Sequence, residues 1–315
     1  MLHALCSMLH ANMDERQRTE LIEIMGESVQ LDCAMSEHTT FRIGGKADAV
    51  CLVRKLGELQ KLFSYINKEK IPYLVVGGGS NLLVRDGGFQ GVVIIMREHL
   101  ASVEQHVKDE QVLVAGGGLP LSNLMRFCSQ RGLGGLEFLA GIPGTVGGAV
   151  IMNAGAFGKD MGSVVQSIEM LSPQGELISL DRPDLAFSYR ASSIQEGSLV
   201  IKASLQCTRE TPPVVSKRVA EYLARRKAAQ PLEYPSAGSV FKNPPGDYAG
   251  RLIEETGLKG KKIGGAMISP KHANYIVNTG GARAEDVLAL MEMAKKKVRE
   301  KTGVELEPEI RVVGD

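Results

Sequence analysis

Residues 141–158 read GIPGTVGGAVIMNAGAFG, a stretch with six glycines and no acidic side chain. This glycine content argues against an ordinary helix, because glycine is costly in helix interiors. Glycine also lets backbone N–H groups approach a ligand closely, and consecutive free N–H groups form concave nests that bind anions. The stretch therefore predicts a loop that binds a phosphate group.

A second glycine-rich loop, residues 77–83 (GGGSNLL), follows the apolar run 73–76, which reads as a buried strand. Two such loops indicate a diphosphate held from two sides, with nearby polar side chains as further donors. Those side chains are Ser80, Asn81, Thr145 and Asn153. The alternative is that both loops are only tight turns between closely packed strands. Two loops with four polar donors favour the phosphate interpretation.

The fingerprints of the two common nucleotide-binding folds are missing from the sequence. A Rossmann fold needs G-x-G-x-x-G, but the segments that begin at Gly77 and Gly116 have Leu82 and Leu121 in place of the third glycine. The P-loop string G-x-x-x-x-G-K-[ST] does not occur. Neither fold is supported.

Six motifs follow one another along the chain. They are TTFRIGG (39–45), VVGGGSNLL (75–83), the stretch 141–158, FSYR (187–190), PSAGSVFKNP (235–244) and LEPEIR (306–311). As an ordered set they resemble UDP-N-acetylenolpyruvoylglucosamine reductases, the flavoenzymes of bacterial peptidoglycan precursor synthesis. The set spans nearly the whole chain and is very specific, whereas singly only the glycine-rich loops and PSAGSVFKNP would be informative.

The resemblance implies an α+β fold with a two-lobed FAD-binding domain of the vanillyl-alcohol-oxidase type and a smaller α+β substrate-binding domain. The expected divisions are an N-terminal extension and lead-in helix (1–38), the FAD-binding domain (39–207, with lobes at about 39–98 and 99–207), the substrate-binding domain (208–303) and a C-terminal strand returning to the active site (304–315). Only about 49 positions separate Arg190 from Ser239. This spacing is too short for the extra tyrosine-bearing loop of one class of the family, so the chain resembles the shorter class.

The implied activity is the NADPH-dependent, FAD-mediated reduction of UDP-N-acetylglucosamine enolpyruvate to UDP-N-acetylmuramate. NADPH is expected as the co-substrate. Neither glycine loop contains His or Cys, so FAD should be bound noncovalently. The flavin supplies the hydride chemistry, and the protein must supply position, charge and a proton.

Composition is consistent with this assignment. The chain has 315 residues, 43% hydrophobic and 23% charged, with a net charge of +1, so nucleic acid is an unexpected partner. Its five widely spaced cysteines suit reduced thiols in the cytoplasm. No run approaches the roughly 18 apolar residues of a membrane span. We expect a cytoplasmic monomer, and the apolar opening MLHALCSMLHA lacks the features of a signal peptide.

Hydrophobic periodicity and turn residues predict the secondary structure. Helices are expected at 13–25, 56–70, 119–130, 212–229, 248–255 and 284–302, strands at 47–53, 73–76, 92–96, 111–115, 199–207 and 274–277, and a hairpin at 164–180. Thr211 is the expected cap of the helix at 212–229. The loop at residue 77 follows the carboxyl end of a strand, where ligands of α/β units generally bind.

Hydride delivery leaves negative charge on the α-carbon and carboxylate of the substrate, and this charge needs a fixed cation and then a proton. By resemblance, Arg190 faces the carboxylate, Ser239 donates the proton and Glu309 stabilises or positions the enolate. A guanidinium can bind an enolate through two parallel hydrogen bonds. Serine is a weak acid, so Ser239 must be held against the carbanion by a neighbour such as Lys242 or a water. Burial could keep Glu309 protonated.

Each catalytic assignment has a simpler alternative. Arg190 could form only a structural ion pair, and Ser239 could be only a turn hydroxyl. On an alternating strand Glu305 and Glu307 would share the face of Glu309, so the family motif alone selects Glu309.

The resemblance also assigns binding residues. Lys242, Asn243, Lys259 and His272 are expected to contact the UDP-sugar, although an exposed lysine is most often only a solvated charge. We also consider that Arg225 and Arg226 meet the diphosphate. The FAD-binding residues are expected to be Gly77, Gly78, Gly79, Ser80, Asn81, Gly141, Gly144, Thr145, Gly147, Gly148, Asn153 and Ala154. No metal ligand is expected.

Two other functions remain open at this point. One is an FAD-dependent oxidase of the same fold, whose flavin would react rapidly with oxygen. The other is a nucleotide-binding module without catalysis, which would purify as a colourless protein.

Overall fold

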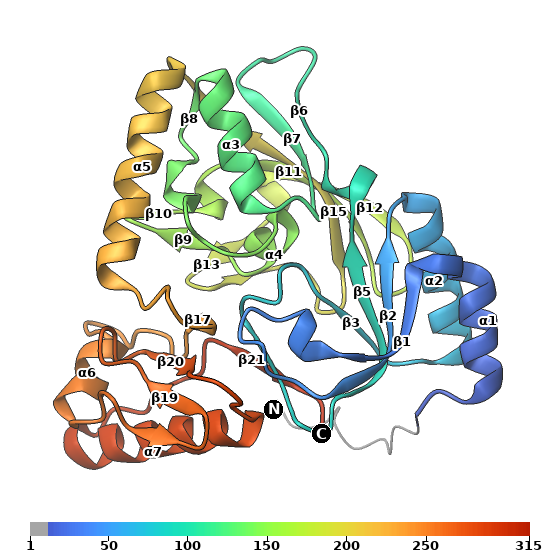
Figure 1. Ribbon diagram of the computed structural model, residues 1–315. Helices are drawn as coiled ribbons and strands as arrows, with labels where there is room; N and C mark the ends of the chain where they lie inside the picture. Colours follow the sequence, from blue (N-terminus) through green and yellow to red (C-terminus); the bar gives the residue numbers. More distant parts are fainter. Residues whose placement is uncertain (1–11) are drawn as a thin grey trace.

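The computed structural model describes residues 12–315, which form two lobes and a third part packed below them (Figure 1). Residues 1–11, which are the whole MLHALCSMLHA opening and include Cys6, lie outside the described part of the chain.

The first lobe is a four-stranded sheet covered by two helices. Its strand order is β1-β2-β5-β3, with β2, β3 and β5 parallel and β1 antiparallel to β2. The elements are α1 Glu15–Met25, β1 Val29–Ala34, β2 Lys46–Val53, α2 Leu56–Glu69, β3 Tyr73–Val75 and β5 Phe89–Met96. Leu59, Leu62, Phe63 and Ile66, the predicted apolar face of α2, are buried in the core of this lobe.

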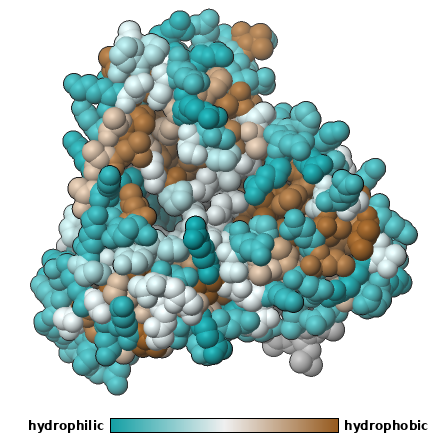
Figure 2. Space-filling view, viewed as in Figure 1, coloured by the Kyte–Doolittle hydropathy of each residue, from teal (hydrophilic) through white to brown (hydrophobic). Residues whose placement is uncertain are grey.

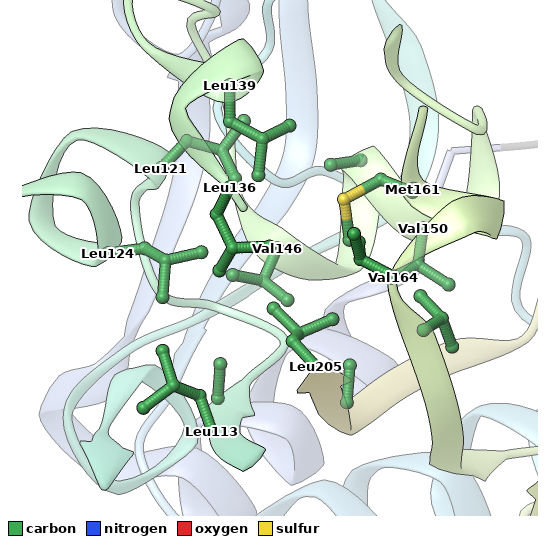
Figure 3. Close-up of a cluster of buried hydrophobic side chains, with 14 of the residues drawn as sticks. Leu113, Leu121, Leu124, Leu136, Leu139, Val146, Val150, Met161, Val164 and Leu205 are labelled. Carbon is green, nitrogen blue, oxygen red and sulfur yellow. The ribbon is translucent and has the colours of Figure 1, made fainter. Parts of the chain in front are cut away.

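The second lobe is an antiparallel five-stranded sheet in the order β12-β11-β15-β7-β6. Its main elements are β6 Val103–Gln105, β7 Val112–Gly116, α3 Leu121–Arg131, α4 Val146–Ile151, β11 Val165–Leu171, β12 Leu177–Asp181 and β15 Leu199–Gln206. Three two-stranded ribbons complete it, namely β8 Leu133–Gly134 with β16 Thr208–Arg209, β9 Gly155–Ala156 with β10 Lys159–Asp160, and β13 Phe187–Ser188 with β14 Ala191–Ser192. Figure 3 shows the apolar core that α3, α4 and the sheet share.

The third part begins with the long helix α5 and continues into a small sheet in the order β17-β20-β19-β18. Its elements are α5 Pro212–Ala229, β17 Ser236–Ser239, α6 Ala249–Glu255, β18 Lys262–Ile263, β19 Ala266–Ile268, β20 Tyr275–Asn278 and α7 Ala284–Thr302. The predicted stripe of α7 is buried, and Gly303 ends the helix in a left-handed conformation with φ 74°.

The third part is joined tightly to the first lobe. Strand β21 (Arg311–Val313) runs parallel to β4 (Leu82–Val84), which directly follows the first glycine loop. The side chain of Asp86 accepts hydrogen bonds from the first backbone N–H groups of α7, at Ala284 and Glu285. Phe41 and Leu83 pack in the same core as α7. The C-terminal segment therefore connects the third part to the first lobe, beside the first glycine-rich loop.

The structure differs from the sequence prediction at four points. Strand β1 lies in the segment assigned to the N-terminal extension, and its alternating exposed polar residues gave it no apolar run. The stretch 141–158 contains a short helix, α4, so the expectation of no helix there was too strong. Thr211 stands at the cap of α5, but its side chain makes no capping hydrogen bond. Residues 303–307 are not a strand, so the alternating face expected for the three glutamates does not exist.

Hydrophilic side chains cover most of the face shown in Figure 2, and hydrophobic residues gather in a few patches. Within residues 12–315, no helix combines the length and apolarity needed to cross a membrane.

Candidate active site

A cavity of about 1300 Å³ lies where the three parts meet. Both glycine-rich loops line it, and so do Arg190, Ser239 and Glu309, which come from three distant parts of the sequence. Buried strands and helices fix each of these segments in place. The cavity is larger than the roughly 300–1,000 Å³ of a typical small-molecule pocket, so it can hold a large ligand together with a second one.

The two glycine loops pack directly against each other, and this contact requires glycine. A Cβ atom added to Gly78 would lie 2.7 Å from the Cα atom of Gly144, and one added to Gly77 would lie 2.4 Å from Oγ1 of Thr145. The Ser80 hydroxyl donates a hydrogen bond of 2.9 Å to the carbonyl of Pro143. The two loops therefore form one continuous backbone surface.

This surface presents unpaired backbone donors. Within residues 12–315, the N–H groups of the five residues Gly77–Asn81, and those of Gly144 and Thr145, have no protein acceptor. Buried or half-buried N–H groups normally find a partner. A row of them facing a cavity provides the donors that a diphosphate requires. The residues present therefore fit the pyrophosphate of a dinucleotide such as FAD.

The polar side chains of these loops mainly hold the loops in shape. Thr145 caps α4 by accepting a hydrogen bond from the Gly148 N–H, and the Asn81 amide donates to the carbonyl of Glu309. Asn153 is buried outside the cavity lining. Its side chain bonds Asp160, the Ser188 carbonyl and the Gly162 N–H. Asn153 thus has no group left for a ligand, whereas the other predicted FAD-binding residues all line the cavity.

Arg190 and Glu309 form an ion pair in the cavity, with 2.7 Å between Nε and Oε1. Arg190 follows β13 in the short ribbon and adopts a left-handed backbone conformation with φ 57°, which is uncommon for a residue with a side chain. Its Nη1 donates to the carbonyl of Gly155, which belongs to the second glycine-rich stretch. The guanidinium is therefore held from two sides and remains only partly exposed.

Burial and two nearby cations act in opposite directions on the pKa of Glu309. Burial raises the pKa of its carboxyl, while the nearby charges of Arg190 and Lys242 partly oppose that rise. Its backbone N–H donates to the carbonyl of Val240, which fixes Glu309 beside the segment containing Ser239. The two other glutamates point elsewhere, since Glu305 pairs with Arg299 and Glu307 pairs with Lys242. The structure thus separates three glutamates that sequence spacing could not.

Ser239 ends β17 and is paired in register with Tyr275 of β20. Both residues line the cavity. Burial raises the pKa of the Tyr275 phenol, and the charge of Arg226 and a hydrogen bond with the Ser239 hydroxyl oppose this rise. Nothing in the sequence distinguished Tyr275 from an ordinary apolar strand residue, so this neighbour of Ser239 was missed.

The four residues assigned to the UDP-sugar do not line the cavity. Lys259 pairs with Glu254 at 2.7 Å, and the Asn243 side chain accepts a hydrogen bond from the first N–H of α6. His272 lies near Lys259, and burial lowers the pKa of its imidazole. Of the four, only Lys242 has a charge that acts on Glu309. The set therefore lies around α6, beside the cavity.

The two adjacent arginines of α5 have different surroundings. Arg226 is buried and lines the cavity, and its Nε donates to the carbonyl of Ala140 at 2.7 Å. Its Nη2 is buried without a partner. Arg225 is exposed and does not line the cavity. Of the two, only Arg226 is in a position to meet a ligand inside it.

No group of His, Cys, Asp and Glu residues within residues 12–315 could hold a metal ion. Cys33, Cys51, Cys128 and Cys207 are free thiols.

Comparison with known proteins agrees with this geometry. Residues 47–181, which include both glycine loops, match the family model of an FAD binding domain. Residues 230–313, which include Ser239 and Glu309, match the C-terminal domain of UDP-N-acetylenolpyruvoylglucosamine reductase.

Curated relatives named UDP-N-acetylenolpyruvoylglucosamine reductase match this chain over nearly their whole length. The protein of Caldanaerobacter subterraneus is 44% identical over 94% of this chain and 97% of its own. The protein of Listeria monocytogenes is 40% identical over 91% and 96%.

Solved structures give the same result. The UDP-N-acetylenolpyruvylglucosamine reductase of Thermus caldophilus is 37% identical, covers 91% of this chain and 100% of its own, and has a TM-score of 0.78. Berberine bridge enzyme, at 16% identity, 64% coverage of this chain, 45% of its own and a TM-score of 0.50, shares only the fold of the flavin-binding part. This chain belongs to the UDP-N-acetylenolpyruvoylglucosamine reductase family and is an FAD-dependent oxidoreductase.

Proposed function

We propose that this enzyme uses NADPH to reduce UDP-N-acetylglucosamine enolpyruvate to UDP-N-acetylmuramate, a step in peptidoglycan precursor synthesis. The observation that most strongly supports the proposal is the convergence of Arg190, Ser239 and Glu309 in one cavity with the two glycine loops. Names of relatives support the substrate, and the geometry supports the chemistry.

The roles of the three residues follow from their contacts. Arg190 binds the carboxylate of the enolpyruvyl group and stabilises the negative charge that develops there. Glu309 holds the Arg190 guanidinium in place through the 2.7 Å contact, and burial raises the pKa of its carboxyl. When bound, FAD supplies the hydride that NADPH provides.

Ser239 donates the proton that completes the reduction. A serine hydroxyl can do so only to a strongly basic carbanion, and only if the alkoxide left behind is stabilised. Tyr275, its register partner on β20, provides a polar neighbour for that purpose. The charges of Arg226 and Arg190 lower the pKa of the Tyr275 phenol, and the charge of Glu309 opposes them.

We also propose that the enzyme acts as a monomer in the cytoplasm and that Lys242, Asn243, Lys259 and His272 bind the UDP moiety. The free thiols suit a reducing compartment. Size-exclusion chromatography with light scattering would test the oligomeric state.

The test of the reaction follows NADPH consumption by the purified yellow protein with and without UDP-N-acetylglucosamine enolpyruvate. We expect strong stimulation by this substrate and formation of UDP-N-acetylmuramate. NADPH consumption that depends only on oxygen would instead identify an oxidase, and the proposal would then fail.

A further inference from the structure

A small aromatic cluster with a nearby cation lies at the tip of the β9–β10 ribbon. The rings of Phe157 and Tyr222 lie 4.5 Å apart at an interplanar angle of 33°. The guanidinium of Arg225 lies 5.8 Å from the Tyr222 ring centre and 6.0 Å from that of Phe157. We call Phe157, Tyr222 and Arg225 the aromatic ledge.

The ledge exposes a large ring at a backbone position that is unfavourable for one. Phe157 is 43% exposed. Its φ of 55° is in the left-handed region, which residues with side chains rarely adopt. Neither feature improves packing of the core, and strained positions of this kind cluster at ligand sites. The ribbon therefore holds this ring at the surface.

The ledge lies at the rim of the active-site cavity. Gly155 and Ala156, immediately before Phe157 in the chain, line the cavity, and so does Arg226. The Arg226 guanidinium lies 5.5 Å from the Phe157 ring centre. A ligand that extends out of the cavity on this side meets the exposed ring of Phe157, which directly follows the lining residue Ala156.

The charge of the region is positive and uncompensated. Within the described residues, the salt bridges of α5 are those of Arg218 with Glu137 and Glu210, so neither Arg225 nor Arg226 has an acidic partner. One nitrogen of Arg226 is buried without any partner. Flat rings beside guanidinium groups bind nucleotides, because bases stack on both and phosphates pair with the cations.

We propose that the aromatic ledge is a subsite for the base and adjoining phosphate of a nucleotide reactant. This inference rests on the proposed function, in which both reactants, the UDP-sugar and NADPH, are nucleotides. The base stacks on the exposed face of Phe157, and Arg225 pairs with a phosphate oxygen. The base can come from either reactant, and the experiment separates the two sources.

The experiment titrates uridine diphosphate and adenosine 2′,5′-bisphosphate into the yellow holoenzyme by calorimetry. Stacking of one base on an aromatic side chain contributes about 1–3 kcal/mol, so Phe157→Ala should weaken at least one probe by about tenfold. Arg225→Gln, on an exposed helix face, should weaken the same probe by about fivefold. Phe157→Tyr and Tyr222→Phe keep the rings and should bind within about twofold of the wild type.

Steady-state kinetics identify the source. If the ledge holds the coenzyme, Phe157→Ala raises KM for NADPH but leaves KM for reduced nicotinamide mononucleotide, which lacks the adenosine, unchanged. If it holds the substrate, KM for the UDP-sugar rises instead. Unchanged affinity for both probes in Phe157→Ala and Arg225→Gln would overturn the inference while leaving the proposed function intact. If the wild-type enzyme shows no turnover but Phe157→Ala and Arg225→Gln still weaken binding of a probe, only the proposed function is overturned.

Discussion

The cavity has two kinds of wall, and they are built differently. On the flavin side, residues 77–81, 144 and 145 present free backbone N–H groups from two loops that touch through glycine. On the side of the third part, the lining consists of side chains such as Arg226, Ser239 and Tyr275. The candidate ligand groups Lys242 and Lys259 lie beside this lining, each paired with a glutamate. A backbone wall is fixed before any ligand arrives, whereas a side-chain wall must exchange internal ion pairs for contacts with the ligand.

The largest expected effect concerns the residues where the two walls meet. Ser239→Ala and Glu309→Gln should lower kcat by about 100- to 10,000-fold, the usual contribution of a positioned proton donor. The protein should stay yellow, because neither side chain belongs to the backbone wall. Stopped-flow and steady-state assays measure the loss.

Glu305→Gln is the matched control for Glu309→Gln, since Glu305 pairs with Arg299 outside the cavity. It should keep full kcat. Equal losses in Glu305→Gln and Glu309→Gln, or full activity in Ser239→Ala, would show that the roles assigned from geometry are wrong.

The second largest effect is expected from a substitution that disrupts the backbone wall. Gly78→Val places atoms within contact distance of Gly144, where the nearest backbone atom is only 2.7 Å from a Cβ. Overpacking of this kind costs about 1–3 kcal/mol, so we expect FAD affinity to fall by about tenfold or more. The bound flavin is measured from visible absorbance after gel filtration.

Gly57→Ala is the corresponding control. Gly57 lies in α2, and a Cβ there meets nothing within 4 Å. This variant should bind FAD normally and gain up to about 1 kcal/mol of stability from better helix propensity. If Gly78→Val retains FAD as well as Gly57→Ala does, the close contact between the loops is not needed for the cofactor.

A smaller effect is expected at Lys259, which lies beside the side-chain wall. Lys259→Gln should raise KM for the UDP-sugar by about tenfold, because hydrogen bonds to charged groups contribute roughly 1.5–3 kcal/mol and part is offset by release of Glu254. kcat should change little. Lys261→Gln, an exposed neighbour, is the control. Identical KM values in the two variants would mean that Lys259 serves only its ion pair with Glu254.

The smallest effect is a pH dependence of stability. Burial lowers the pKa of His272 below that of the unfolded chain, which is near 6.5. Between the two pKa values the unfolded state binds more protons, so stability falls as pH drops from 7 towards 5. His272→Gln should make the free energy of unfolding less dependent on pH across this window, as measured by urea denaturation. A slope as steep as that of the wild type would contradict this reading of His272.

The contrast between the walls also explains what the sequence could predict. Glycine clusters mark a backbone site directly, so the loops at 77 and 141 were located from sequence, and α2 and α7 were predicted from their apolar stripes. The resemblance supplied Arg190, Ser239 and Glu309. Residues whose role depends on tertiary contact were not predictable, because the pairing of Tyr275 with Ser239 arises only when β17 meets β20.

Asn153 shows what local sequence leaves undecided. A polar residue inside a glycine-rich stretch suggested a donor to the ligand, but in the fold both amide N–H groups and the Oδ1 atom bond other parts of the chain. Local sequence indicates which groups can donate, and only packing decides whether another part of the chain takes them.

The most direct test of the central claim is anaerobic and uses the purified yellow protein. NADPH is added until the visible absorbance bleaches, and then UDP-N-acetylglucosamine enolpyruvate is added in the absence of oxygen. We predict that the yellow colour returns within the turnover time and that one UDP-N-acetylmuramate forms per flavin. A flavin that stays bleached with this substrate but recovers rapidly in air would contradict the account.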